Sequence, residues 1–227
     1  MAEKTKKRVS PQKKEKMKRL FSLLEELYPE AVCALEYGGD PYKLLVMGRL
    51  SAQCTDARVN LVAGPLFARY PTAADLAEAD QAELEGYIRS CGLYRTKAKD
   101  LIGACRMLCE RFRGVLPRDM DELLLLPGVG RKIANLLRGD LFGLPAVVAD
   151  THCIRLSSRL AFTPKGCRDP LLTERTLTPL LEGMNSSDFC HRLVLFGREV
   201  CTAKNPACHA CPLQGAGLCE GEKKGKS

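Results

Sequence analysis

The sequence contains no long hydrophobic run. Hydrophobic side chains make up 45% of its 227 residues, yet no stretch approaches the ~20 apolar residues that span a bilayer. The first residues also lack the apolar core of a signal peptide. We therefore expect a cytoplasmic protein (nucleoid-associated if bacterial) with no membrane partner. We also expect a monomer. There is no internal repeat either, which argues against a repeat architecture.

Strand signals are almost absent. Only Ala146-Val147-Val148-Ala149 resembles a strand, and it is too short and isolated to build a sheet. Helix signals recur instead. Capping residues predict helix starts at Ser10-Pro11, Asp40-Pro41, Thr72 with Asp75, Asp80 with Glu83, Pro117 with Asp119, and Asp150. Further helices are predicted at about 95–111, 170–182 and 186–199. The sequence therefore predicts an all-α protein with short connections.

Positive charge is concentrated at the N-terminus. The chain has a net charge of +8, and residues 1–19 hold nine Lys or Arg and two acidic residues, a net +7. A basic arm of this kind can hold DNA through phosphates without reading its sequence. A solvated tail that confers solubility explains the same composition equally well. The function must therefore be argued from motifs rather than from overall basicity.

Four of the twelve cysteines lie close together near the C-terminus. Cys201, Cys208, Cys211 and Cys219 are on a loop-like segment, and thiolates this close imply a metal or a cluster. Zinc usually takes two Cys-x2-Cys units, whereas this segment has only one. Iron–sulfur clusters accept more varied spacing. The other eight cysteines are scattered through predicted helices, and we interpret them as small core residues.

The stretch from Leu126 to Lys132 reads as helix, tight turn, helix. Gly128 and Gly130 flank Val129, and glycine allows a backbone to approach a ligand closely. The second helix starts with free N–H groups, which favour a phosphate. Lys132 stands just beyond the turn as a possible amine nucleophile. Taken alone, a glycine turn between helices and an exposed lysine are both common features of protein surfaces.

Together these features resemble the endonuclease III family of DNA glycosylases, over about residues 20–220. Leu50-Ser51-Ala52-Gln53-Cys54-Thr55-Asp56 is similar to its LSAQ-x-TD helix, and Gly92-Leu93-Tyr94 with Lys97-Ala98 is similar to its GLY-x-x-KA segment. The glycine turn matches the helix-hairpin-helix of the family. Ala149-Asp150-Thr151-His152 is similar to its VDTH motif, and the four cysteines correspond to its 4Fe-4S ligands. Two features depart from the pattern. The last cysteine gap is seven residues instead of five, with the extra residues in an expected flexible loop at 214–217, and Ala149 replaces a valine.

The resemblance implies two helical lobes flanking a DNA-binding cleft. A six-helix barrel with the helix-hairpin-helix would comprise residues 34–144. An iron–sulfur cluster domain would combine residues 20–33 with 145–227, and the basic arm would be residues 1–19. Lys132 and Asp150 would face each other across the cleft. Gly128, Gly130 and Arg131 would contact the DNA.

The resemblance also implies a mechanism. The damaged nucleotide is rotated out of the duplex, with Gln53 bonding the orphaned partner base and Leu93 wedged between base steps. Lys132 attacks C1′, displaces the oxidised pyrimidine, and β-elimination cleaves the strand 3′ to the site. We expect desolvation and Arg131 to favour the neutral amine, whereas a close Asp150 would favour the charged form. Asp150 would accept a proton or stabilise positive charge on the sugar, although it also reads as an ordinary helix N-cap.

Three other functions fit part of the pattern. An adenine-specific mismatch glycosylase generally lacks a lysine at the Lys132 position and carries a further recognition domain. A glycosylase for alkylated bases would leave the lysine unexplained. A non-catalytic module with a helix-hairpin-helix and a zinc site would leave Lys132 and Asp150 without a role.

We interpret His152 as structural.

Overall fold

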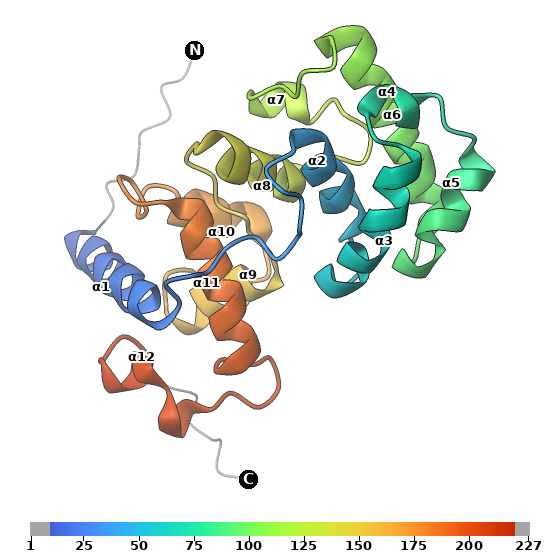
Figure 1. The fold of residues 1–227 in the computed structure, drawn as a ribbon. Coiled ribbons are helices and arrows are strands. Elements are labelled where there is room, and N and C mark those ends of the chain that lie inside the picture. Colours follow the sequence, from blue (N-terminus) through green and yellow to red (C-terminus); the bar gives the residue numbers. More distant parts are fainter. Residues whose placement is uncertain (1–9, 221–227) are drawn as a thin grey trace, which may run out of the picture. The chain divides into compact units, whose positions relative to one another are not determined.

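The fold is entirely helical. The computed structural model describes residues 10–220, so residues 1–9 of the predicted basic arm lie outside the described part. Residues 10–220 form helices α1–α12 and the 3-10 turns η1 and η2, without a strand in that range (Figure 1). The all-α prediction is confirmed. No helix in this range is both long and apolar enough to cross a membrane.

The chain divides into two compact units. One is Cys33–Leu144, and the other combines the residues up to Val32 with those from Pro145 onward. The unit Cys33–Leu144 contains η1 (Arg89–Cys91) and the helices α2 (Pro41–Leu50), α3 (Asp56–Arg69), α4 (Ala73–Ala77), α5 (Gln81–Ile88), α6 (Tyr94–Phe112), α7 (Met120–Leu123) and α8 (Arg131–Phe142). Apart from the single turn α7, these are six helices.

Capping side chains define where these helices begin. Asp40 accepts hydrogen bonds from the first turn of α2, which starts at Pro41. Thr72 and Asp75 form a reciprocal capping box at α4. Asp80 caps α5 by accepting a hydrogen bond from the N–H of Glu83. The long helix α6 buries an apolar face that packs against α4 and α5, while α2 packs against α8. The predicted helix starts in this unit are therefore confirmed.

The second unit contains the helices α1 (Pro11–Leu27), α9 (Thr151–Arg159), α10 (Pro170–Leu177), α11 (Ser186–Glu199) and α12 (Pro212–Gly215), with η2 (Cys208–Ala210). Helix α11 packs against both α1 and α9. The described half of the predicted basic arm belongs to α1. There, Lys16 Nζ donates to the carbonyl of Leu160 at 2.8 Å and Lys13 Nζ to that of Phe162 at 3.1 Å. These ammonium groups lie at the C-terminal end of α9, where the helix dipole favours positive charge.

Three predicted details need correction. Helix α10 ends at Leu177 rather than near residue 182, because Pro179 lacks an N–H and obstructs the preceding turn. The segment Ala146–Ala149 is no strand: the N–H of Ala146 donates to the Ser186 hydroxyl at 2.8 Å. Only half of the eight scattered cysteines are buried, namely Cys91, Cys105, Cys153 and Cys190, whereas Cys33, Cys54, Cys109 and Cys167 are half-buried.

Candidate functional site

The predicted helical hairpin is present in the unit Cys33–Leu144. Helix α7 runs into a turn in which the N–H of Val129 donates to the carbonyl of Leu126 at 3.0 Å. Leu126 and Val129 are both buried and anchor the turn in the core. Helix α8 then starts after Gly130, and no side chain caps its first turn. Backbone N–H groups at an uncapped helix start are suited to bind a phosphate.

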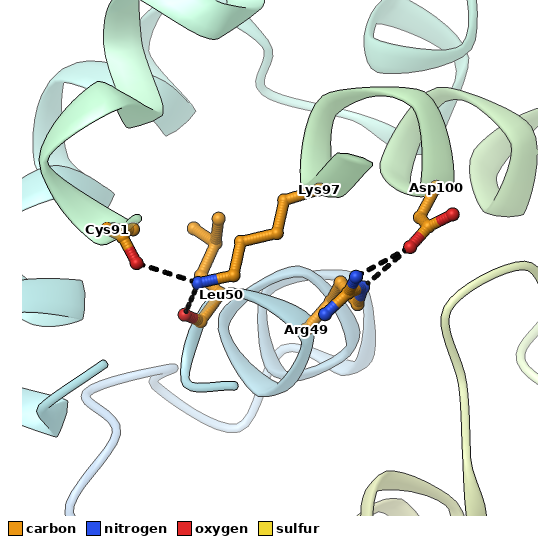
Figure 2. A network of polar contacts seen from close by, with 5 residues as sticks. All are labelled: Arg49, Leu50, Cys91, Lys97 and Asp100. Carbon is orange, nitrogen blue, oxygen red and sulfur yellow. Dashed lines mark hydrogen bonds and ion pairs between the residues drawn. The ribbon is translucent and has the colours of Figure 1, made fainter. Parts of the chain in front are cut away.

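The two glycines of the hairpin serve different purposes. Gly128 has φ 74°, and a Cβ there would lie 2.6 Å from Nε of Arg49 and 2.8 Å from Cβ of Asp100. Arg49 and Asp100 form an ion pair, with Nη2 2.6 Å and Nε 2.9 Å from Oδ2 (Figure 2). Because Gly128 has no side chain, the turn can pack directly against this ion pair. Gly130 has φ −92° and no atom within 4 Å of an added Cβ, so its surface is open to a ligand.

Lys132 is the second residue of α8 and its side chain is exposed, as is that of Arg131 before it. The expected desolvation of the Lys132 amine is therefore not supplied by the surrounding protein. Exposure leaves the amine accessible to a large substrate.

Gln53 and Leu93 lie on two loops of the same unit. Gln53 follows α2 and Leu93 precedes α6, and both side chains are exposed. Both adopt left-handed backbone angles, with φ 54° and 46°. Each such residue costs about 1–2 kcal/mol unless it is glycine. The expected LSAQ-x-TD helix is therefore wrong in one respect: the motif joins the end of α2 to the start of α3, and the left-handed Gln53 interrupts it.

Asp150 is the N-cap of α9 in the second unit. Its Oδ1 accepts from the backbone N–H of Cys153 at 2.7 Å, which fixes the half-buried carboxylate at the helix start. His152, the second residue of α9, lies against α11, where its ring limits the space beside Gly197. This packing agrees with a structural interpretation of His152.

The four C-terminal cysteines belong to the second unit and all are half-buried. Cys201 follows α11, Cys208 opens η2, Cys211 precedes α12 and Cys219 comes after it. Two of the thiols meet Arg159: its Nη1 lies 3.3 Å from Sγ of Cys201, and its carbonyl oxygen 3.9 Å from Sγ of Cys219. Burial raises the pKa of the Cys201 thiol, whereas the hydrogen bond and charge of Arg159 oppose that rise. Four partly buried thiols, one of them beside the Arg159 guanidinium, form a donor set that suits an iron–sulfur cluster.

Two arginines of α9 hold the cysteine segment. Arg159 Nη1 donates to the carbonyl of Thr202 at 2.7 Å, and Nη2 to that of Ala203 at 3.1 Å. Arg155 Nη2 donates to the carbonyls of Gly197 and Cys201 at 2.9 and 3.0 Å. The start of the cysteine segment is therefore tied to the helix that Asp150 caps.

The longer gap before Cys219 is more ordered than we expected. Instead of a flexible loop at 214–217, the chain forms the short helix α12. Leu213 within this helix and Leu218 after it are both buried. The N–H of Leu218 donates to the carbonyl of Leu213 at 2.9 Å. Arg19 on α1 adds a hydrogen bond to the carbonyl of Ala216 at 2.7 Å. The buried leucines explain why extra residues here fold back on themselves.

Sequence reasoning missed the side chains that support these loops. Arg49, Lys97 and Asp100 lie beneath the hairpin and the two loops, while Arg155 and Arg159 hold the cysteine segment. In the sequence, Lys97 belongs to the GLY-x-x-KA motif, which gives it no role of its own. The signal that marks these residues, full or partial burial of a charged group, exists only in the folded chain.

Comparisons with known proteins agree on one family. Residues 46–182 match the model of the HhH-GPD superfamily of base excision DNA repair proteins. Residues 201–215 match the iron–sulfur binding domain of endonuclease III, a range that ends before Cys219. Endonuclease III of Synechocystis sp. is 46% identical over 208 residues, 91% of this chain and 93% of that protein.

Two solved structures have the same fold. A non-covalent endonuclease III–DNA complex is 42% identical with a TM-score of 0.84, over 91% of this chain and 94% of that one. A trapped endonuclease III–DNA covalent intermediate has the same identity and TM-score, over 91% and 95%. With its 4Fe-4S cysteine segment, this chain belongs to the endonuclease III family of base excision DNA glycosylases and abasic-site lyases.

Proposed function

We propose that the chain removes oxidised pyrimidines from double-stranded DNA and cleaves the strand 3′ to the resulting abasic site, with Lys132 as the nucleophile. The observation that carries this assignment is the exposed Lys132 amine in the first turn of α8, beside an uncapped helix start. Phosphate bound at this helix start would place a deoxyribose within reach of that amine. Gly128, Gly130 and Arg131 would form the backbone contact.

The chemistry follows from the amine. Neutral Lys132 Nζ attacks C1′, and the C1′–N bond breaks as the base leaves with its electron pair. Ring opening gives a Schiff base between Lys132 and the sugar, which acidifies the proton on C2′. Loss of that proton expels the 3′ phosphate by β-elimination, and water then releases the lysine. Asp150 acts on the same nucleotide, where its carboxylate stabilises positive charge on the sugar or accepts a proton.

The exposed residues Gln53 and Leu93 open the duplex in this proposal. Leu93 enters between base steps, and the Gln53 amide bonds the partner base left behind. Their left-handed backbone supports the assignment, because strained, exposed residues of this kind are concentrated at ligand-contacting sites.

We also propose that Cys201, Cys208, Cys211 and Cys219 ligate the 4Fe-4S cluster, which supplies a rigid centre for the segment. The unit Cys33–Leu144 then corresponds to the DNA-binding barrel and the other unit to the cluster domain. Because the similar endonucleases III come from bacteria, we place the protein in the cytoplasm as a monomer acting on the chromosome.

Borohydride trapping tests the nucleophile. The parent protein and the Lys132→Gln and Lys132→Arg variants are incubated with a thymine-glycol duplex and borohydride, which reduces a Schiff base to a stable adduct. We expect a covalent adduct with the parent only, and duplex binding within about three-fold for Lys132→Arg, which keeps the charge. An adduct formed by Lys132→Gln at the parental rate would show that another amine attacks C1′.

A further inference from the structure

Lys97 is a fully buried lysine in the first turn of α6. Its Nζ donates to the carbonyl of Leu50 at 2.8 Å and to the carbonyl of Cys91 at 2.8 Å (Figure 2). Burial lowers the pKa of Lys97, while the neighbouring Cys54 and Cys91 act in the opposite direction. Lysine is almost never fully buried unless it is paired. The two carbonyls provide that pairing through charge-assisted hydrogen bonds.

One accepting carbonyl lies at the helix end that leads into the first loop proposed to open the duplex, and the other lies at the start of the second loop. Leu50 is the last residue of α2, three positions before Gln53. Cys91 ends η1, two positions before Leu93. A single ammonium therefore links the loop 51–54 to the loop 91–93, although the two are far apart in the chain.

Both loops need such support. Gln53 and Leu93 hold left-handed angles without the freedom of glycine, and Leu93 stands at the N-cap position of α6 without forming a side-chain cap. Strained backbone of this kind persists only where its surroundings fix it. Lys97 makes the contact that is common to both loops. An aliphatic side chain in its place would leave both carbonyls without this donor.

We propose that Lys97 is a positioning residue that clamps the loops 51–54 and 91–93 together, so that Gln53 and Leu93 enter the duplex as one preformed unit. The inference rests on the proposed function of these two residues. Lys97 itself is buried beneath them and does not touch the DNA. It acts by reducing the ordering that the loops would otherwise undergo on binding.

The test compares two substrates in each preparation. Lys97→Met keeps the length and removes the ammonium, and Lys99→Met on the exposed face of α6 is the matched control. One substrate is a duplex with a central abasic site, and the other is the same abasic strand alone, in which no partner base is displaced. The readout is the ratio of kcat/KM on duplex to that on single strand. Any inactive fraction of the protein cancels in this ratio.

We expect Lys97→Met to lower the ratio by about 30- to 100-fold, the scale of a small misplacement of contacting groups. Lys99→Met should leave the ratio within about two-fold. A 2-aminopurine opposite the abasic site should show slower fluorescence gain with Lys97→Met, because the partner base is unstacked more slowly. An equal loss on both substrates would mean that Lys97 only stabilises the fold, and would overturn the proposal.

A double-mutant cycle with Leu93→Ala identifies the route of action. If Lys97 acts through the loops, Lys97→Met lowers the duplex ratio by less than about three-fold once Leu93 is truncated. Full additivity would overturn the proposal. Lys97→Arg, which keeps the charge and the donors, should retain more of the ratio than Lys97→Met, and failure of this rescue would also count against the clamp.

The same cycle separates failure of the inference from failure of the proposed function. If Leu93→Ala and Gln53→Ala both leave the duplex ratio unchanged, the wedge assignment is wrong and the clamp is overturned with it. If these variants lower the ratio while Lys97→Met does not, only the clamp is wrong.

Discussion

Helices α8 and α9 each begin at a candidate catalytic residue, but they begin in different ways. Helix α8 starts after Gly130, which has no side chain to cap the first turn. Helix α9 starts at Asp150, whose own carboxylate bonds the N–H of Cys153. The start of α8 therefore favours binding of an external anion, whereas the start of α9 fixes the carboxylate of Asp150 itself. This difference indicates that capping and catalysis need not exclude each other at Asp150.

The two starts also differ in what supports them. Gly128, just before α8, rests on the Arg49–Asp100 ion pair within the same unit. Helix α9 is tied through Arg155 and Arg159 to the cysteine segment. The position of Asp150 should therefore depend on the cluster, whereas that of Lys132 should not. The following predictions test this contrast, from the largest expected effect to the smallest.

Removing one cluster thiol should affect one helix start and spare the other. Cys211→Ala is expected to give colourless protein without the visible absorption of the cluster, because three thiolates leave it open to oxidation. Hydrogen exchange of the α9 amides should accelerate by about 100-fold or more as the cysteine segment loosens. Exchange within α8 should stay near the parental rate. Equal acceleration in both helices would remove the contrast between the two supports.

Asp150→Asn should separate capping from charge. Asn and Asp cap helices about equally well, so the melting temperature should change by less than about 2 °C. Base release from a thymine-glycol duplex should fall by about 10²- to 10⁴-fold, because the carboxylate is lost as a proton acceptor or charge stabiliser. Turnover and thermal unfolding are measured on the same preparations, with Asp188→Asn, a half-buried aspartate in the first turn of α11, as the control. Unchanged turnover would leave Asp150 as a cap alone.

Gly128→Ala should disturb the hairpin from beneath. The added methyl group meets Arg49 and Asp100, and φ 74° disfavours alanine. We expect a stability loss of about 2–3 kcal/mol in denaturant unfolding, together with weaker DNA binding. Gly130→Ala, with φ −92° and open space, is the matched control and should cost less than about 1 kcal/mol. Equal costs at the two positions would contradict the different purposes assigned to the glycines.

Gly130→Asp should make the start of α8 resemble that of α9. A capping carboxylate there is expected to stabilise the protein by a few tenths of a kcal/mol, about the margin of Asp over Gly as a cap. It should also weaken duplex binding by about 10-fold at low salt, because it occupies the N–H groups and repels phosphate. Gly130→Asn supplies a similar cap without the charge and should weaken binding less. Tighter binding by Gly130→Asp would argue against a phosphate at this helix start.

The features that sequence could predict are the local ones. Asp40, Thr72 and Asp80 cap the helices that they precede, because a cap bonds N–H groups only two or three residues away. The hairpin and the start of α9 follow from the same short-range chemistry. The predicted helix 170–182 is longer than α10 because the apolar pattern continues past Thr178, whereas Pro179 ends the helix.

The supporting contacts could not be predicted because they join distant residues. Arg49 and Asp100 are 51 positions apart, and Lys97 reaches back 47 positions to Leu50. The sequence motif places Lys97 beside Ala98. It does not show that the Lys97 ammonium is buried under two loops. Likewise, Arg159 reads from sequence as a charged residue at a helix end. Only the fold brings it to Cys201, 42 positions away.

The division of the chain into a continuous unit and a flanking one has a consequence for synthesis. Helix α1 emerges first from the ribosome, but its partner α11 lies beyond the whole of Cys33–Leu144. The continuous unit can bury its core while translation proceeds, at about 5–20 residues per second. Until α11 is synthesised, α1 lacks this packing partner, and Leu20 and Leu24 stay exposed to solvent. The order of synthesis thus separates assembly of the continuous unit from assembly of the flanking unit, which can be completed only after α11 has been made.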